Sequence, residues 1–165
     1  METLAFDLQK ALEPFSKNAE NTFVAYLQRH KRRARMTAED IQNAIFWLTN
    51  LDQHGQTTAE CNNRKSALER FRYDKETGNL IALKCDRVHT ERVVIPEHQI
   101  FKTICYEHHQ NGHSGQLATG KAIVNNYYGI VREEVYFLLS HCNICTRNAS
   151  NRSKVPLTSM VSTSL

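Results

Sequence analysis

The chain has 165 residues and a modest formal net charge of +4, and it contains no long uncharged apolar run of the kind that spans a membrane. Its N-terminus carries Glu2 and Asp7, where a secretory signal would have a basic start and an apolar core. We therefore expect a soluble intracellular protein with no membrane partner, built as one ordinary domain or two small ones.

Cysteine usage points to metal binding rather than to disulfides. The chain has five cysteines, an odd number, and the expected compartment is reducing. Two of them form a Cys-x-x-Cys motif at Cys142 and Cys145, whereas Cys61, Cys85 and Cys105 stand in no such motif.

Positive charge is concentrated in two segments. The first contains Arg29, Lys31, Arg32, Arg33 and Arg35, and the second is the chain after His141, which has cations but no acidic residue. A solvated helix end, a nucleic-acid contact and a nuclear-import signal all fit the first segment. We expect a nuclear location, or a cytoplasmic one before import.

Apolar spacing predicts helices over residues 3–30, with Pro14 opening a new turn, and a further helix that begins at Thr37. Asp40 stands three residues after Thr37, as in a capping box. Residues 54–64 are polar and are predicted to form a linker, so residues 1–60 are treated as a helical N-terminal region of unknown role.

A small β-rich extension is predicted over residues 66–98. Two β-favouring runs flank a turn at Gly78, and the segment 92–96 reads as a third strand stopped by proline. A sheet of this size needs a neighbouring element to pack on.

Residues 99–147 are predicted to form three helices, and residues 148–165 a flexible tail. The first helix carries the histidines, the second ends at Tyr127-Tyr128-Gly129, and the third runs from about Arg132 to Ser140 and leads to the cysteines. The predicted fold is thus mainly α with a small β element.

Histidines at 108, 109 and 113 followed by Cys142 and Cys145 supply two local pairs of the ligands that zinc prefers. Two thiolates also balance the charge of Zn²⁺. From spacing, either His108 or His109 can pair with His113. We predict one structural zinc ion.

The segment HHQNGHSGQLATGKAIVNNYYGIVREEVYFLLSHCNICTRN resembles the zinc-binding N-terminal domain of retroelement integrases, especially gypsy-type integrases and related cellular integrase-like proteins. The resemblance covers about residues 68–147 and does not extend to residues 1–60. By position it implies the zinc ligands His108, His113, Cys142 and Cys145. It also implies a compact three-helix unit of helix-turn-helix type, which in the family contacts element-end DNA and assists multimer assembly.

The chain departs from that family in two ways. Gly129 stands where many relatives have tryptophan, and the residues after Cys145 contain no Asp or Glu, so the acidic catalytic core of integrases is absent from this chain. We predict no enzymatic activity and no small-molecule substrate.

Two functions follow as predictions. The first is a zinc-stabilised DNA-binding module of an integrase or an integrase-derived protein, and the second is a protein-interaction module that forms homo-oligomers, with zinc as a structural staple. The cations predicted to contact DNA phosphates are Arg32, Arg33, Lys121, Arg132 and Arg147.

Overall fold

The computed structural model describes residues 2–84 and 89–147. It is mainly helical (60%) with a small four-strand sheet (11%), which confirms the predicted fold class. The predicted tail at 148–165 and Cys85 lie outside the described residues. No helix within the described ranges has the length and apolarity needed to cross a membrane.

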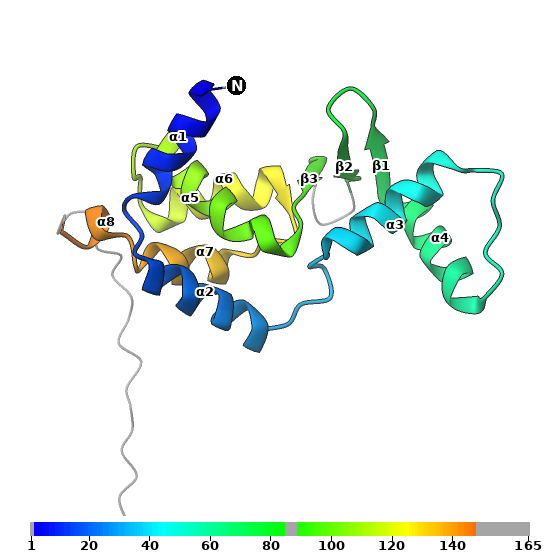
Figure 1. Ribbon diagram of the computed structural model, residues 1–165, viewed down its shortest axis with the longest axis horizontal. Helices are drawn as coiled ribbons and strands as arrows, with labels where there is room; N and C mark the ends of the chain where they lie inside the picture. Colours follow the sequence, from blue (N-terminus) through cyan, green and yellow to red (C-terminus); the bar gives the residue numbers. More distant parts are fainter. Residues whose placement is uncertain (1, 85–88, 148–165) are drawn as a thin grey trace, which may run out of the picture.

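The elements follow one another in this order: α1 (Glu2–Leu12), α2 (Lys17–Arg29), α3 (Ala38–Thr49), α4 (Thr58–Arg70), β1 (Phe71–Asp74), β2 (Asn79–Ala82), β3 (Arg92–Val94), η1 (Glu97–Gln99), α5 (Ile100–Gln110), α6 (Gln116–Asn126), β4 (Tyr127–Tyr128), α7 (Arg132–Leu139) and α8 (Asn143–Arg147). Figure 1 shows two groups of elements: α1, α2 and α5–α8 lie on one side, and α3 and α4 lie with β1 and β2 on the other. The strand β3 and the connection between α2 and α3 join them.

The sheet has the order β1-β2-β3-β4, with antiparallel β1/β2 and β2/β3 pairs and a parallel β3/β4 pair. The hairpin between β1 and β2 turns at Gly78, whose φ of +72° is readily adopted only by glycine. The three predicted strands are therefore present. The prediction missed β4, because Tyr127 and Tyr128 form a strand only by pairing with the distant β3.

The short pair β3/β4 contributes to two separate cores. Side chains of neighbouring residues in a strand point to opposite faces. Val93 and Tyr127, which pair with each other, pack on the core around the helices α2, α5 and α7, whereas the next pair, Val94 and Tyr128, packs on the core around α3 and α4. The sheet thus connects the two halves of the protein.

The first core, here called the metal-side core, includes residues of α2 that recur every four positions, namely Ala19, Phe23 and Leu27. Ser16 caps this helix by accepting a hydrogen bond from the Ala19 N–H at 3.1 Å. The remaining buried members are Phe15, Ile95, Ile100, Phe101, Ile104, Cys105, Ile123, Ile130, Val135, Leu138, Leu139 and Cys142. The N-terminal residues and the predicted zinc-binding segment therefore share one core.

The second core, the sheet-side core, consists of buried Ala44, Trp47, Ala67, Phe71, Leu80, Ala82 and Val94. The predicted capping box of α3 is present, since Thr37 and Asp40 exchange backbone-to-side-chain hydrogen bonds. The predicted linker at 54–64 is wrong over its second half, which belongs to α4. A second capping box, formed by Thr57 and Glu60, stabilises the start of that helix. Ala67 is the one buried residue of the helix, so most of its other positions can be polar.

Arg35, which the sequence groups with the exposed basic run, is buried in an ion pair with Glu134 of α7. Its guanidinium also donates to the carbonyl oxygen atoms of Leu27, at 2.8 Å, and His30. The second carboxylate oxygen of Glu134 accepts from the Val131 N–H at the start of α7. This ion pair ties the α2–α3 connection to α7.

Gly129, the position where many integrases have tryptophan, has a φ of +97°, in the left-handed region that favours glycine. A Cβ at this position would lie 3.5 Å from the Ala34 carbonyl oxygen and 3.6 Å from that of Ile95. The chain turns sharply from β4 toward α7 here, close to the connection that carries Arg35. The two Cβ distances are ordinary contact distances, so it is the backbone conformation, more than the space, that favours glycine at this position.

Candidate metal centre

The first histidine pair is created by the end of α5. His108 lies in the last turn of this helix, on its buried face. Gly112 and His113 both have left-handed backbone angles, with φ of +60° and +55°, and the His113 N–H bonds back to the carbonyl oxygen of His108 at 3.0 Å. This reversal brings the His113 ring to 4.6 Å from that of His108, measured between ring centroids.

The two cysteines follow α7 on a short turn. The N–H of Cys142 bonds to the Leu139 carbonyl at 3.1 Å, which closes the end of α7, and Cys145 lies one turn further on, in α8. The Asn143 N–H between them bonds to the Pro14 carbonyl at 2.9 Å. The Cys-x-x-Cys turn is therefore held by the segment that joins α1 to α2.

Four side-chain donor atoms converge at this point, from His108, His113, Cys142 and Cys145, and all of them lie within 4.8 Å of one another. His108 Nε2 is 3.1 Å from the Cys145 sulfur, and His113 Nδ1 is 3.5 Å from Cys142 Sγ and 3.9 Å from Cys145 Sγ. Imidazole nitrogen and thiolate sulfur are both good ligands for transition metals. This His₂Cys₂ group can hold a metal ion.

Thr119 of α6 fixes the orientation of the first histidine. Its hydroxyl donates to the Ser114 carbonyl at 3.1 Å, so it is available to accept from His108 Nδ1–H, which lies 3.3 Å away. With the proton on Nδ1, His108 presents the lone pair of Nε2 toward the cysteines. Thr119 is fully buried, and its supporting role was not predicted, because no motif in the sequence marks it.

Burial sets the protonation of the metal-free group. It lowers the pKa of His108 to about 4, with a smaller effect of His113, and also lowers the pKa of His113, so that neutral imidazoles are favoured at pH 7. Burial and the neighbouring Cys142 raise the pKa of Cys145 to about 12. A bound dication reverses the preference of that thiol, because metal coordination favours the thiolate.

Of the two histidines that spacing left open, His108 belongs to the group of four and His109 does not. Neighbouring helix residues point about 100° apart, and only one of the two can face the cysteines. The His109 ring lies 6.0 Å from that of His113, next to a surface pocket that Lys10 and Arg147 also line. Cys105 is buried in the metal-side core and is not one of the four donors.

Replacing Thr119 with valine is expected to weaken metal affinity by about 10- to 100-fold while leaving the fold intact, because valine keeps the shape but cannot accept the His108 proton. Competition titration with a chromogenic chelator measures this change. Thr103→Val in α5 is the matched control, because among the described residues its hydroxyl bonds to the Gln99 carbonyl oxygen and to no other group. Equal affinities for both variants would show that Thr119 does not orient the ligand.

The five predicted DNA-contacting cations are all exposed, but they lie on different elements. Arg32 is 3.8 Å from Glu133, which places it beside the N-terminus of α7, where Arg132 also lies. Arg33 lines a pocket at α3 and α4, Lys121 is on the outer face of α6, and Arg147 is in α8. The structure therefore does not gather all five at one point.

The sequence did not reveal how the N-terminal residues support the metal centre. The Phe15 ring packs edge-on against the His108 ring, with centroids 6.4 Å apart, and also against Phe101 of α5 at 6.1 Å. An aromatic residue just after Pro14, followed by the helical spacing of α2, was the available signal for a buried segment. Its partner was not predictable, because the contact joins positions 93 residues apart in the chain.

Comparison of the chain with protein-family models, curated protein sequences and solved structures found no match. The likeness to integrase zinc-binding domains therefore depends on the residues of the motif itself, and it stays a prediction.

Proposed function

We propose that this protein is a zinc-stabilised DNA-binding module without catalytic activity, related to the N-terminal part of retroelement integrases. The observation that carries the proposal is the convergence of His108, His113, Cys142 and Cys145 from two separated segments of the chain, residues 108–113 and 142–145. These are the same four residues that the resemblance to integrases implies as zinc ligands.

Zinc fits the donor set and its dimensions. Typical bond lengths of about 2.0–2.1 Å to nitrogen and 2.3 Å to sulfur give tetrahedral N···S edges of about 3.6 Å. The two His113–cysteine distances, 3.5 and 3.9 Å, bracket this value, and the His108–Cys145 distance of 3.1 Å needs a small outward shift. Four protein ligands fill a tetrahedral zinc, which leaves no position for an activated water, so the metal would stabilise the fold.

The outer face of α6 supports nucleic-acid contact. Leu117, Lys121 and Asn125 recur every four residues and are exposed, with 76% of the Leu117 surface accessible. Lysine binds phosphates, asparagine pairs with adenine edges, and apolar side chains contact thymine methyl groups. The integrase resemblance favours the interpretation of this face as a DNA-binding surface.

Duplex DNA affinity, measured by fluorescence anisotropy over a series of salt concentrations, tests this function. We expect the affinity to fall steeply with salt, and the slope to decrease by about one for each phosphate contact removed in Lys121→Gln and Arg132→Gln. Lys17→Gln is the control, because Lys17 forms a surface ion pair with Glu20 at 2.6 Å on α2. Absent or salt-independent DNA binding by the zinc-loaded protein would contradict the proposal.

The exposure of Leu117 also favours the second candidate function, a protein-interaction module that self-associates. An apolar contact of this kind is largely insensitive to salt. Sedimentation at several concentrations distinguishes the two functions: concentration-dependent dimers that Leu117→Gln abolishes, together with no DNA binding, would favour the interaction module.

A further inference from the structure

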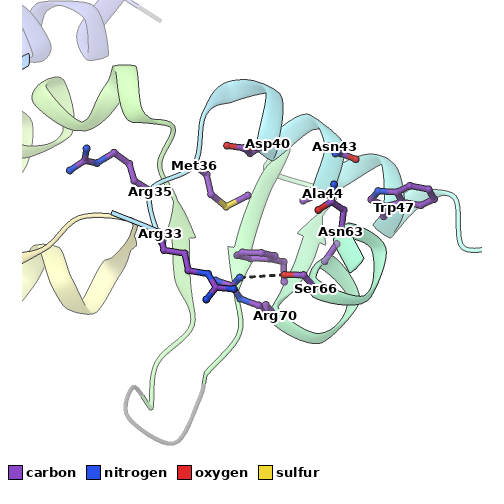
Figure 2. A pocket seen from close by; sticks show the side chains of 12 residues that line it. Arg33, Arg35, Met36, Asp40, Asn43, Ala44, Trp47, Asn63, Ser66 and Arg70 are labelled. Carbon is purple, nitrogen blue, oxygen red and sulfur yellow. Dashed lines mark hydrogen bonds between the residues drawn. The ribbon is translucent and has the colours of Figure 1, made fainter. Parts of the chain in front are cut away.

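A second candidate site lies between α3 and α4, away from the metal centre (Figure 2). It is a pocket of about 270 Å³, and the connection between α2 and α3 contributes Arg33, Arg35 and Met36 to its lining. Most of the polar side chains that line it are hydrogen-bond donors or contain donor groups: Arg33, Asn43, Trp47, Asn63, Ser66 and Arg70.

Three arginines line this pocket, Arg33, Arg35 and Arg70. The Arg35 guanidinium is engaged by Glu134, whereas Arg33 and Arg70 have no carboxylate partner among the described residues. Figure 2 shows the side chain of Arg33 extending toward that of Arg70. Arg70 is held in place, since it donates to Ser66 Oγ at 3.3 Å and to the Tyr128 hydroxyl, and lies over the Phe71 ring at 5.2 Å. Arg33 is exposed and makes no such contact within the described part of the chain.

Trp47 supplies an independent sign that a ligand is accommodated here. Its side chain is buried, with 6% exposed, yet its indole N–H has no hydrogen-bond partner among the described residues. In Figure 2 the ring nitrogen lies on the side that faces Asn63, within the pocket lining. A buried donor without an acceptor is unfavourable, and a ligand oxygen would provide the acceptor.

Asp40 is the carboxylate among the pocket-lining residues. It is engaged as part of the capping box of α3, where one oxygen accepts from the Thr37 N–H and from the Thr37 hydroxyl, each at 2.9 Å. These hydrogen bonds orient the carboxylate but do not remove its charge; the guanidinium groups of Arg33 and Arg70 outnumber it, so the pocket lining carries a net positive charge.

We propose that this pocket binds the phosphate group of a nucleotide, either free or within a nucleic-acid strand. Arginine presents a planar fork of N–H donors that matches phosphate oxygens, and two arginines together match a group with several anionic oxygens. The neutral donors of Asn43, Asn63 and Trp47 add contacts that a nonspecific surface charge would lack. The strand form of this proposal rests on the proposed DNA-binding function, whereas the free-nucleotide form does not.

Trp47 makes the test direct, because it is the single tryptophan of the chain and its indole N–H gives one unambiguous NMR signal. The zinc-loaded full chain, labelled with ¹⁵N, is titrated with thymidine 5′-monophosphate and, separately, with thymidine. The monophosphate is expected to shift the indole signal in a saturable way, and the nucleoside to leave it unchanged. An equal shift with thymidine, or no shift with the monophosphate, overturns the proposal.

Arg33→Gln is expected to weaken monophosphate binding by about tenfold or more, because a charge-assisted contact is lost. The variant should fold normally, since Arg33 makes no described structural contact. Lys31→Gln is the matched control: it removes one charge from the same run, but Lys31 does not line the pocket and its variant should bind like the wild type. Equal losses in both variants would overturn the proposal, because they would show only a general charge effect.

A short oligothymidylate distinguishes the two sources of phosphate. Tighter binding than the monophosphate, with the same dependence on Arg33, assigns the pocket to a strand, and equal or weaker binding assigns it to a free nucleotide. The experiments distinguish a failure of the phosphate-pocket proposal from a failure of the proposed DNA-binding function. Duplex binding that depends on Lys121 and Arg132 while the indole signal ignores phosphate would overturn only the pocket, whereas monophosphate binding without duplex binding would overturn only the DNA-binding function.

Discussion

Replacing Cys142 with serine, or removing the metal with a chelator, is expected to unfold the metal-side core at 37 °C. Cys142 is fully buried in that core and is one of the four proposed ligands. Structural zinc contributes an apparent 10–16 kcal/mol in zinc-finger peptides, which is comparable to the whole stability of about 5–15 kcal/mol of an ordinary domain. The loss should extend to α2, because Phe23 and Leu27 pack in the same core.

Far-UV circular dichroism during heating measures this loss, and elemental analysis of the purified protein should find about one equivalent of zinc in the wild type. Cys61→Ser is the control: Cys61 is exposed, outside the group of four, and its replacement should change stability by less than about 0.5 kcal/mol. A Cys142→Ser protein with wild-type helicity and melting temperature would refute a structural metal.

Replacing Glu134 with glutamine is expected to lower the free energy of unfolding by about 3–5 kcal/mol, because it leaves the Arg35 cation buried without its closest charge partner. The two side chains are 0% and 3% exposed. Glu97, 3.9 Å from the Arg35 guanidinium and partly exposed, compensates only weakly. Glutamine has a single carbonyl oxygen and can keep the bond to the Val131 N–H only by turning its NH2 group toward Arg35, so the expected loss includes one hydrogen bond as well as the charge.

Urea denaturation provides the measurement, with Glu133→Gln as the neighbouring control. Glu133 is 66% exposed and 3.8 Å from Arg32, so losing its charge should cost no more than about 1 kcal/mol. The double variant Arg35→Met/Glu134→Gln should be more stable than Glu134→Gln alone, since no unpaired charge then remains buried. A double variant less stable than the single one would mean that the arginine hydrogen bonds, and not the ion pair, dominate.

Local features of the fold followed from the sequence because they depend on residues a few positions apart. The capping box of Thr37 and Asp40, the hairpin turn at Gly78 and the helix leading to the histidines were predicted correctly. The two local pairs, His108 with His113 and Cys142 with Cys145, also follow from short spacings, and the four side chains lie close enough to hold a metal ion, but the meeting of the two pairs depends on the packing of distant segments. The start of α4 was missed although its capping box at Thr57 and Glu60 is local, because its mostly polar composition resembled a linker.

The contacts between distant segments were decided by the tertiary structure alone. The sequence placed Arg35 in an exposed basic run, and it is buried because α7 brings Glu134 to it from 99 residues away. Tyr127 and Tyr128 became a strand because β3 lies beside them, and His108 was selected over His109 because its face of α5 meets the cysteines. Composition and periodicity describe which side of an element is buried, but they do not name the partner, since that depends on how the whole chain packs.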